Sequence, residues 1–84
     1  MLTLYEFLDL PMVERGEYIN RKCTFLIYRR DESEVEYFLY YAKAYFVEVQ
    51  FDIKRQELMR VRPFTKPCYL EPYLNDVDLR QVLE

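Results

Sequence analysis

The sequence has no histidine and no tryptophan, and it contains one glycine and one serine among 84 residues. Without histidine, the chain lacks the commonest general base and metal ligand of enzymes. Gly16 alone cannot make a glycine-rich phosphate loop, and Ser33 lies in a charged turn with no base beside it. Glu48 and Asp52 alternate along one predicted strand face, which is typical of a solvated face rather than of a catalytic pair. We therefore predict a protein that is not an enzyme and uses no metal or cofactor.

Cysteine is also scarce, and Cys23 and Cys68 are the two that the chain has. The stretch MLTLYEFLDLPMVERGEY carries acidic residues where a secretory signal has a basic start and an apolar middle. We therefore expect a cytoplasmic protein whose two thiols are reduced and buried, as free cysteines usually are. Two distant cysteines without a histidine also make a weak zinc site.

Long hydrophobic runs and an excess of basic charge are missing as well. No apolar run approaches the roughly 20 residues that a membrane-spanning helix needs. Twelve basic and fifteen acidic residues give a net charge of −3. This balance argues against a general binder of nucleic acid or of anionic membranes, which needs a surplus of lysine and arginine. The length predicts a single domain over residues 1–84.

The first 22 residues predict a helical segment in two pieces. Thr3 and Glu6 have the spacing of a capping box, which satisfies the free N–H groups at a helix start. Asp9 followed by Pro11 indicates a second start, with the proline in the first turn.

The middle of the chain predicts four strands joined by short polar turns. Because turns of about four residues favour neighbouring antiparallel strands, the expected product is a meander. Pro63 cannot donate to a strand ladder, so it is expected to end the fourth strand. The predicted class is α+β, with the N-terminal helical segment and a short C-terminal helix packing on one face of the sheet. The predicted strands span residues 23–30, 35–42, 45–53 and 58–62.

The C-terminal part predicts one or two short helical turns. Pro67 and Pro72 each suit the first turn of a helix. At helical spacing, Leu70, Leu74 and Val77 would share one face.

Aromatic residues are concentrated in the stretch YFLYYAKAYFVEVQF, which has seven rings in fifteen residues. Strand side chains alternate between faces, so one set of alternating residues belongs on the core face: Tyr45, Val47, Val49, Phe51 and Ile53. We call the opposite side of the sheet the far face, and Phe46 lies on it. The preceding strand is apolar on both sides, so its orientation depends on the hairpin loop.

Two hairpin loops are compatible with the pattern. A two-residue loop at Lys43-Ala44 pairs Tyr40 with Val47, and a three-residue loop over residues 42–44 pairs Leu39 with Val47. Both loops favour a residue with positive φ, so turn chemistry does not choose between them. The two-residue loop puts Tyr37, Leu39, Tyr41 and Phe46 on the far face, and the three-residue loop puts Phe38, Tyr40 and Phe46 there.

Three roles for the far face stay open. The chain's own residues 69–74 could cover it. Contiguous exposed rings also mark interaction sites, which indicates a surface for another protein, with self-association the simplest version. The third role is a platform for a small ligand or single-stranded nucleic acid, in which strand arginines flank the stacking rings. Those arginines are Arg29, Arg30, Arg60 and Arg62.

Several short motifs resemble a family of small uncharacterised bacterial proteins of similar length. They are YEF at residues 5–7, YFVEV at 45–49, RPF at 62–64 and LEPYL at 70–74. The resemblance implies the two-residue loop, because family members carry a more turn-like pair at Lys43-Ala44. It implies no activity and no functional residues. The predicted function is a non-catalytic protein-interaction domain that binds itself or another protein through Phe46 and the rings beside it.

Overall fold

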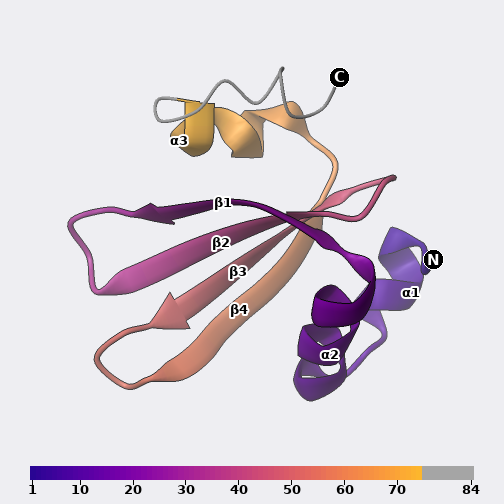
Figure 1. The fold of residues 1–84 in the computed structure, drawn as a ribbon, viewed down its shortest axis with the longest axis horizontal. Coiled ribbons are helices and arrows are strands. Elements are labelled where there is room, and N and C mark those ends of the chain that lie inside the picture. Colours follow the sequence, from indigo (N-terminus) through magenta and orange to yellow (C-terminus); the bar gives the residue numbers. More distant parts are fainter. Residues whose placement is uncertain (75–84) are drawn as a thin grey trace.

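Four antiparallel strands form one sheet in the order β1-β2-β3-β4 in the computed structural model, which describes residues 1–74 (Figure 1). The α+β class and the meander are therefore confirmed. The elements, in chain order, are α1 (Leu4–Leu8), α2 (Met12–Lys22), β1 (Thr24–Arg30), β2 (Val35–Tyr41), β3 (Phe46–Asp52), β4 (Glu57–Phe64), the 3-10 helix η1 (Pro67–Leu70) and α3 (Glu71–Leu74).

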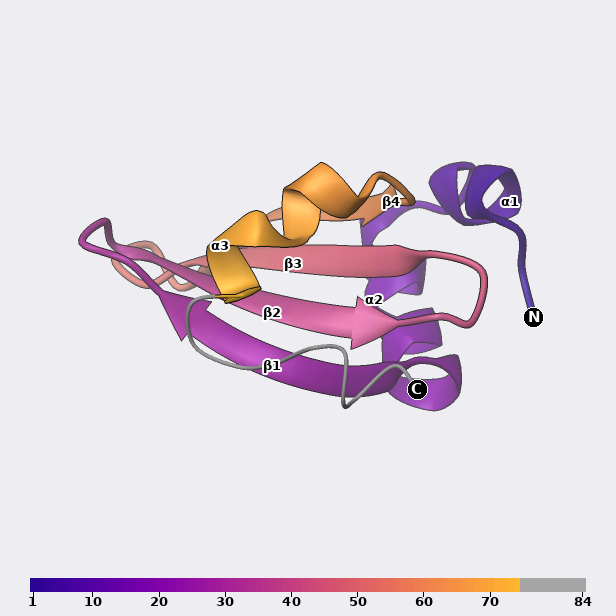
Figure 2. The ribbon, with the colours of Figure 1, turned by 90° about the horizontal axis from the view of Figure 1, so that it is seen from above.

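Helices pack on both faces of the sheet, so the prediction that they share one face is wrong. Helices α1 and α2 lie on the face that carries Val47, which we call the near face, and η1 and α3 lie on the far face (Figures 1 and 2). The reason is the composition of β2, which is apolar on both sides and therefore needs cover on both sides.

The N-terminal helices begin and end close to the expected positions. Thr3 and Glu6 form the capping box in both directions, as predicted. Asp9 caps the C-terminal end of α1, and Pro11 is the N-cap of α2 rather than a residue of its first turn, so α2 begins later than expected. Arg15 holds the bend between the two helices, because its guanidinium donates to the carbonyls of Leu8 and Leu10 at 2.7 and 2.9 Å.

The β2–β3 hairpin has the two-residue loop. Tyr40 pairs with Val47, and the Ala42 N–H donates to the Tyr45 carbonyl at 2.9 Å. Lys43 adopts a φ of 65°, in the left-handed region that the loop requires and that lysine seldom occupies. The register therefore places Tyr37, Leu39 and Tyr41 on the far face with Phe46, and Tyr40 on the near face.

Strand β4 continues through Pro63 to Phe64, so the prediction that Pro63 ends it is wrong. Because β4 is an edge strand, one side of its backbone has no ladder partner, and a proline there removes no hydrogen bond.

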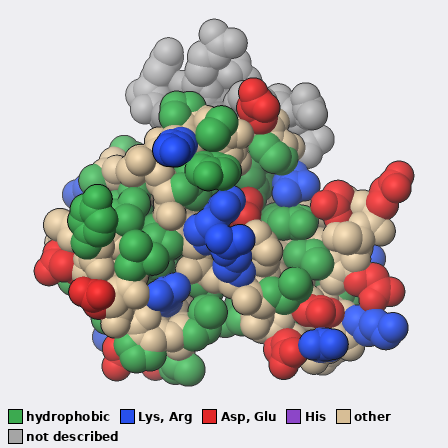
Figure 3. All heavy atoms as spheres, turned by 180° about the vertical axis from the view of Figure 1, so that it is seen from behind, with side chains coloured by type: hydrophobic (Ala, Val, Ile, Leu, Met, Phe, Trp, Pro, Cys, Tyr) green, Lys and Arg blue, Asp and Glu red, His purple; other side chains and the backbone are tan. Residues whose placement is uncertain are grey.

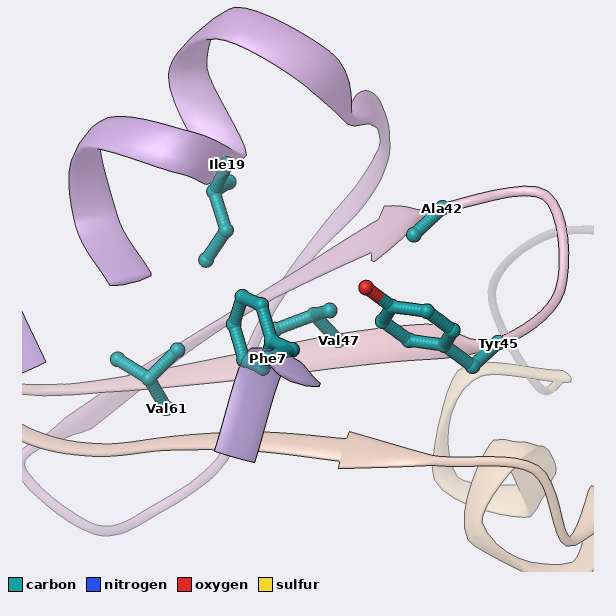
Figure 4. Close-up of a cluster of buried hydrophobic side chains, with 6 residues drawn as sticks. All are labelled: Phe7, Ile19, Ala42, Tyr45, Val47 and Val61. Carbon is teal, nitrogen blue, oxygen red and sulfur yellow. The ribbon is translucent and has the colours of Figure 1, made fainter. Parts of the chain in front are cut away.

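The near-face core lies under α1 and α2. Phe7, Ile19, Val47 and Val61 are buried together, and the Phe7 ring lies 6.0 Å from that of Tyr45 (Figure 4). Two hydrogen bonds fix the N-terminus to this core: the Tyr45 hydroxyl donates to the Leu2 carbonyl, and the Leu2 N–H donates to the Tyr18 hydroxyl.

The predictions for the cysteines and for the C-terminal helical turns have different outcomes. Cys23 is half-buried against the near-face core, but Cys68 is exposed in η1, so the predicted burial is wrong for Cys68. Pro67 opens η1, as expected. Val77, the last member of the predicted C-terminal face, lies outside the described residues. Within residues 1–74, no helix has the length and apolar character needed to cross a membrane.

Candidate binding surface

The chain's own C-terminal segment covers part of the far face, which was predicted as the partner surface. Leu39 and Tyr73 are both 0% exposed and belong to one buried cluster with Phe64. Phe46 is half-buried and stacks on Phe64 with ring centroids 5.7 Å apart. Leu39 therefore belongs to the core under the C-terminal segment, whereas Phe46 and Tyr41 line a small open hollow beside the β2–β3 turn.

A charged network lies under that segment. The Glu48 carboxylate is buried and accepts from the Tyr73 hydroxyl at 2.7 Å and from Gln50 Nε2 at 2.8 Å. A guanidinium nitrogen of Arg62 lies 3.6 Å from the same carboxylate. Burial of the Tyr73 hydroxyl and its bond to Glu48 raise the pKa of Tyr73 well above the ordinary value. The network thus holds a neutral tyrosine against a carboxylate.

Two of the predicted ligand-binding arginines are committed to aromatic rings. The Arg29 guanidinium lies 3.9 Å from the centre of the Tyr37 ring, and that of Arg62 lies 4.4 Å from the Tyr69 ring. Such cation–π contacts support the far-face packing. The Nε atoms of both arginines are buried without a hydrogen-bond partner among the described residues.

The four arginines do not converge on one site. Arg60 is exposed on the far face, where it pairs with Gln50, and Arg30 is exposed on the near face, opposite Glu36. Because Arg30 is on the other side of the sheet, the set does not form a single cationic platform.

The open hydrophobic surface is on the near face. A groove of about 340 Å³ runs between α2 and the half of the sheet that ends at the β1–β2 and β3–β4 turns. We call it the near-face groove. Its lining is mostly apolar, as is usual for binding sites. The groove is lined by Gly16, Ile19 and Asn20 of α2 and by Glu36, Phe38, Tyr40, Val49, Phe51, Leu58 and Val61 of the sheet.

The groove exists because α2 covers only part of the near face. In Figure 1 the helix lies under the end of the sheet near the β2–β3 turn, and the strands extend beyond it. Gly16 adds to the opening, since a Cβ built at this position meets no atom within 4 Å. Of the five residues predicted for an interface, Tyr40 is the one that lines this groove.

Aromatic pairs continue from the groove to the β1 edge. Tyr28 packs on Phe38 with ring centroids 5.3 Å apart, and Phe25 packs on Tyr40 at 5.5 Å. Phe25 is 51% exposed and Tyr28 is 43% exposed. Exposure of a Phe-sized side chain forgoes about 1.5–3 kcal/mol of burial energy, so contiguous rings indicate a surface with a use. Other hydrophobic side chains reach the surface on the side seen in Figure 3, among charged ones.

One carboxylate lies among these rings. Glu36 lines the groove and accepts a hydrogen bond of 2.6 Å from the Tyr28 hydroxyl. This bond raises the pKa of Tyr28. The pairing of an acid with ring faces can hold a cationic group.

The sequence did not predict this groove, because parity assigned Phe51 and its neighbours to the core. A signal was present in α2. Its apolar residues Met12, Val13 and Ile19 are few, and Gly16 sits between them. A helix of this kind has too little apolar surface to cover the whole near face.

Comparisons with protein-family models, with curated proteins and with solved structures found no match to this chain. The resemblance to a small bacterial family therefore stays a prediction.

Proposed function

We propose that this protein is a small non-catalytic interaction domain that binds another protein, or a second copy of itself, through the near-face groove. The observation that supports the proposal is the groove itself, an apolar hollow with exposed rings at its border. The proposal keeps the predicted function and places it on the near face, since η1 and α3 cover part of the far face and bury Leu39.

Gly16 allows a direct test, because its α-hydrogen faces open space in the groove wall. Gly16→Phe would introduce a ring at the groove wall, at a position where an added Cβ meets no atom within 4 Å. Gly16→Ala, the matched control, would leave the groove largely open. The measurement is affinity capture from cell extract with each immobilised variant, quantified by mass spectrometry, together with the solution mass by light scattering.

Proteins retained by wild-type and Gly16→Ala protein, and lost with Gly16→Phe, would support the proposal. A dimer that Gly16→Phe converts to a monomer would support its self-association version. If Gly16→Phe leaves both the captured proteins and the solution mass unchanged, the groove is not the binding surface.

A further inference from the structure

We propose that the near-face groove selects a basic partner segment, in which lysine or arginine lies among apolar side chains, with Glu36 as its anchor. This inference rests on the proposed function and specifies its partner. The occupant is identified by two features of the groove, its charge and its rings.

The charge of the groove is negative. Among the described residues that line it, Glu36 is the one with a charged side chain. The adjoining β1–β2 turn carries three exposed acids, Asp31, Glu32 and Glu34, and no base. Arg30 faces Glu36 across the β1–β2 ladder, but these two residues are not among the salt bridges of the described residues. The β3–β4 turn at the same end carries Lys54 and Arg55, which Asp52 and Glu57 balance in charge. A cationic side chain beside Glu36 therefore finds a net acidic surrounding, owing to the β1–β2 turn.

The rings beside Glu36 suit the same cation. Phe38 and Phe51 line the groove, and the ring of Tyr28 packs on Phe38. Aromatic faces attract ammonium and guanidinium groups, and the attraction grows as the cation loses water. The alkyl stem of lysine or arginine can lie along apolar surface while its charged end reaches a carboxylate. An acidic or neutral apolar segment would use the rings but would leave Glu36 with its Tyr28 hydrogen bond and without a cationic partner.

A second copy of this chain is a less suitable occupant. The chain carries a net charge of −3, so two copies repel each other at long range. Self-association is therefore treated as an outcome of the test.

The test is selection from a library of random twelve-residue peptides displayed on phage. Wild-type protein is the target, and the Gly16→Phe protein removes peptides that bind elsewhere. The enriched peptides are then synthesised, and their Kd is measured on wild-type, Glu36→Gln and Glu34→Gln proteins. Glu34→Gln is the matched control, because it removes the same charge from the turn outside the groove.

We expect enriched peptides that combine lysine or arginine with apolar residues. Glu36→Gln should raise their Kd at least about tenfold, as expected for loss of a contact to a charged group, and Glu34→Gln should change it less than about threefold. Neutral or acidic peptides that Gly16→Phe blocks would overturn the basic partner while leaving the proposed function intact. A dimer abolished by Gly16→Phe, without enriched basic peptides, would do the same. No enriched peptide and a monomeric protein would overturn both.

Discussion

Tyr73 is the residue through which the C-terminal segment contacts the charged part of the far face. Its ring is fully buried, and its hydroxyl donates to the Glu48 carboxylate at 2.7 Å. Tyr73→Phe keeps the ring and removes the donor, which leaves a buried carboxylate with one partner fewer. We expect the free energy of unfolding to fall by about 1–3 kcal/mol, measured by urea denaturation.

Tyr69 provides the control for this substitution. Its ring is partly exposed, and no hydrogen bond from its hydroxyl is found among the described residues. Tyr69→Phe should therefore change stability by less than about 0.5 kcal/mol. Equal losses in the two variants would show that the bond to Glu48 contributes nothing specific.

The raised pKa of the Tyr73 hydroxyl predicts that the protein loses stability at alkaline pH. The pKa of Tyr73 is raised by burial and by its bond to Glu48, and burial also raises that of Tyr45. Above the ordinary tyrosine pKa near 10, the unfolded chain releases protons that the folded chain keeps. The native state then binds more protons, so the free energy of unfolding decreases as pH rises.

Urea denaturation between pH 8 and about pH 11 measures this dependence. Stability should decline above pH 10, and Tyr73→Phe should make the decline shallower. Tyr5→Phe, at a side chain that is 78% exposed, should leave the slope unchanged. A slope that is the same in all three proteins would contradict the assignment.

At the scale of elements, Gly16 lowers the stability of helix α2. Glycine in a helix interior is about 1 kcal/mol less favourable than alanine. Because a Cβ at this position meets no atom within 4 Å, Gly16→Ala should raise the free energy of unfolding by about that amount. Chemical denaturation checks this. A loss of stability instead would mean that another group occupies the space beside α2.

Some element boundaries could be predicted because they depend on local chemistry, whereas the end of β4 could not, because it depends on β4 being an edge strand. The capping box at Thr3 fixed the start of α1, and the alternation along β3 assigned Val47 and Val49 to the core side. The hairpin loop could not be derived from the residues, because Lys43 is a poor residue for the left-handed conformation that it adopts. At Lys43, the pairing of β2 with β3 overrides the preference of lysine for a negative φ.

The candidate surface was harder to predict than the elements. Parity shows which side of a strand a residue occupies, but it does not show how far a covering helix extends. Phe38 and Phe51 have the pattern of core residues, and they border a groove only because α2 stops short of them. Conversely, Leu39 lies on the far face, which was predicted to be a partner surface, and it is buried together with Tyr73. Tyr73 is distant from Leu39 in sequence, so the strand pattern does not reveal this contact.

At the scale of the whole molecule, the sheet separates the two cysteines. Cys23 packs against the near-face core, and Cys68 lies in η1 on the far face. A disulfide requires Cα atoms within about 7 Å, and placement on opposite sides of the sheet disfavours a bond between these two. Burial also raises the pKa of the Cys23 thiol, which lowers its fraction of reactive thiolate.

Thiol labelling of the native protein should therefore proceed in two phases. Exposed Cys68 should react with Ellman's reagent first, and Cys23 should react slowly until urea is added. Cys68→Ser should abolish the fast phase. A single phase for both thiols in native buffer would contradict the described burial of Cys23.

Each strand of the meander pairs with the strand synthesised just before it, so the sheet can assemble as the chain leaves the ribosome. The far face is different, because its cover comes from residues 67–74, which follow every strand. At typical rates of translation, Leu39 and Phe64 remain without this cover for about a second after β4 is complete. During that interval the nascent chain displays a hydrophobic sheet face, which is the time when chaperones would matter most.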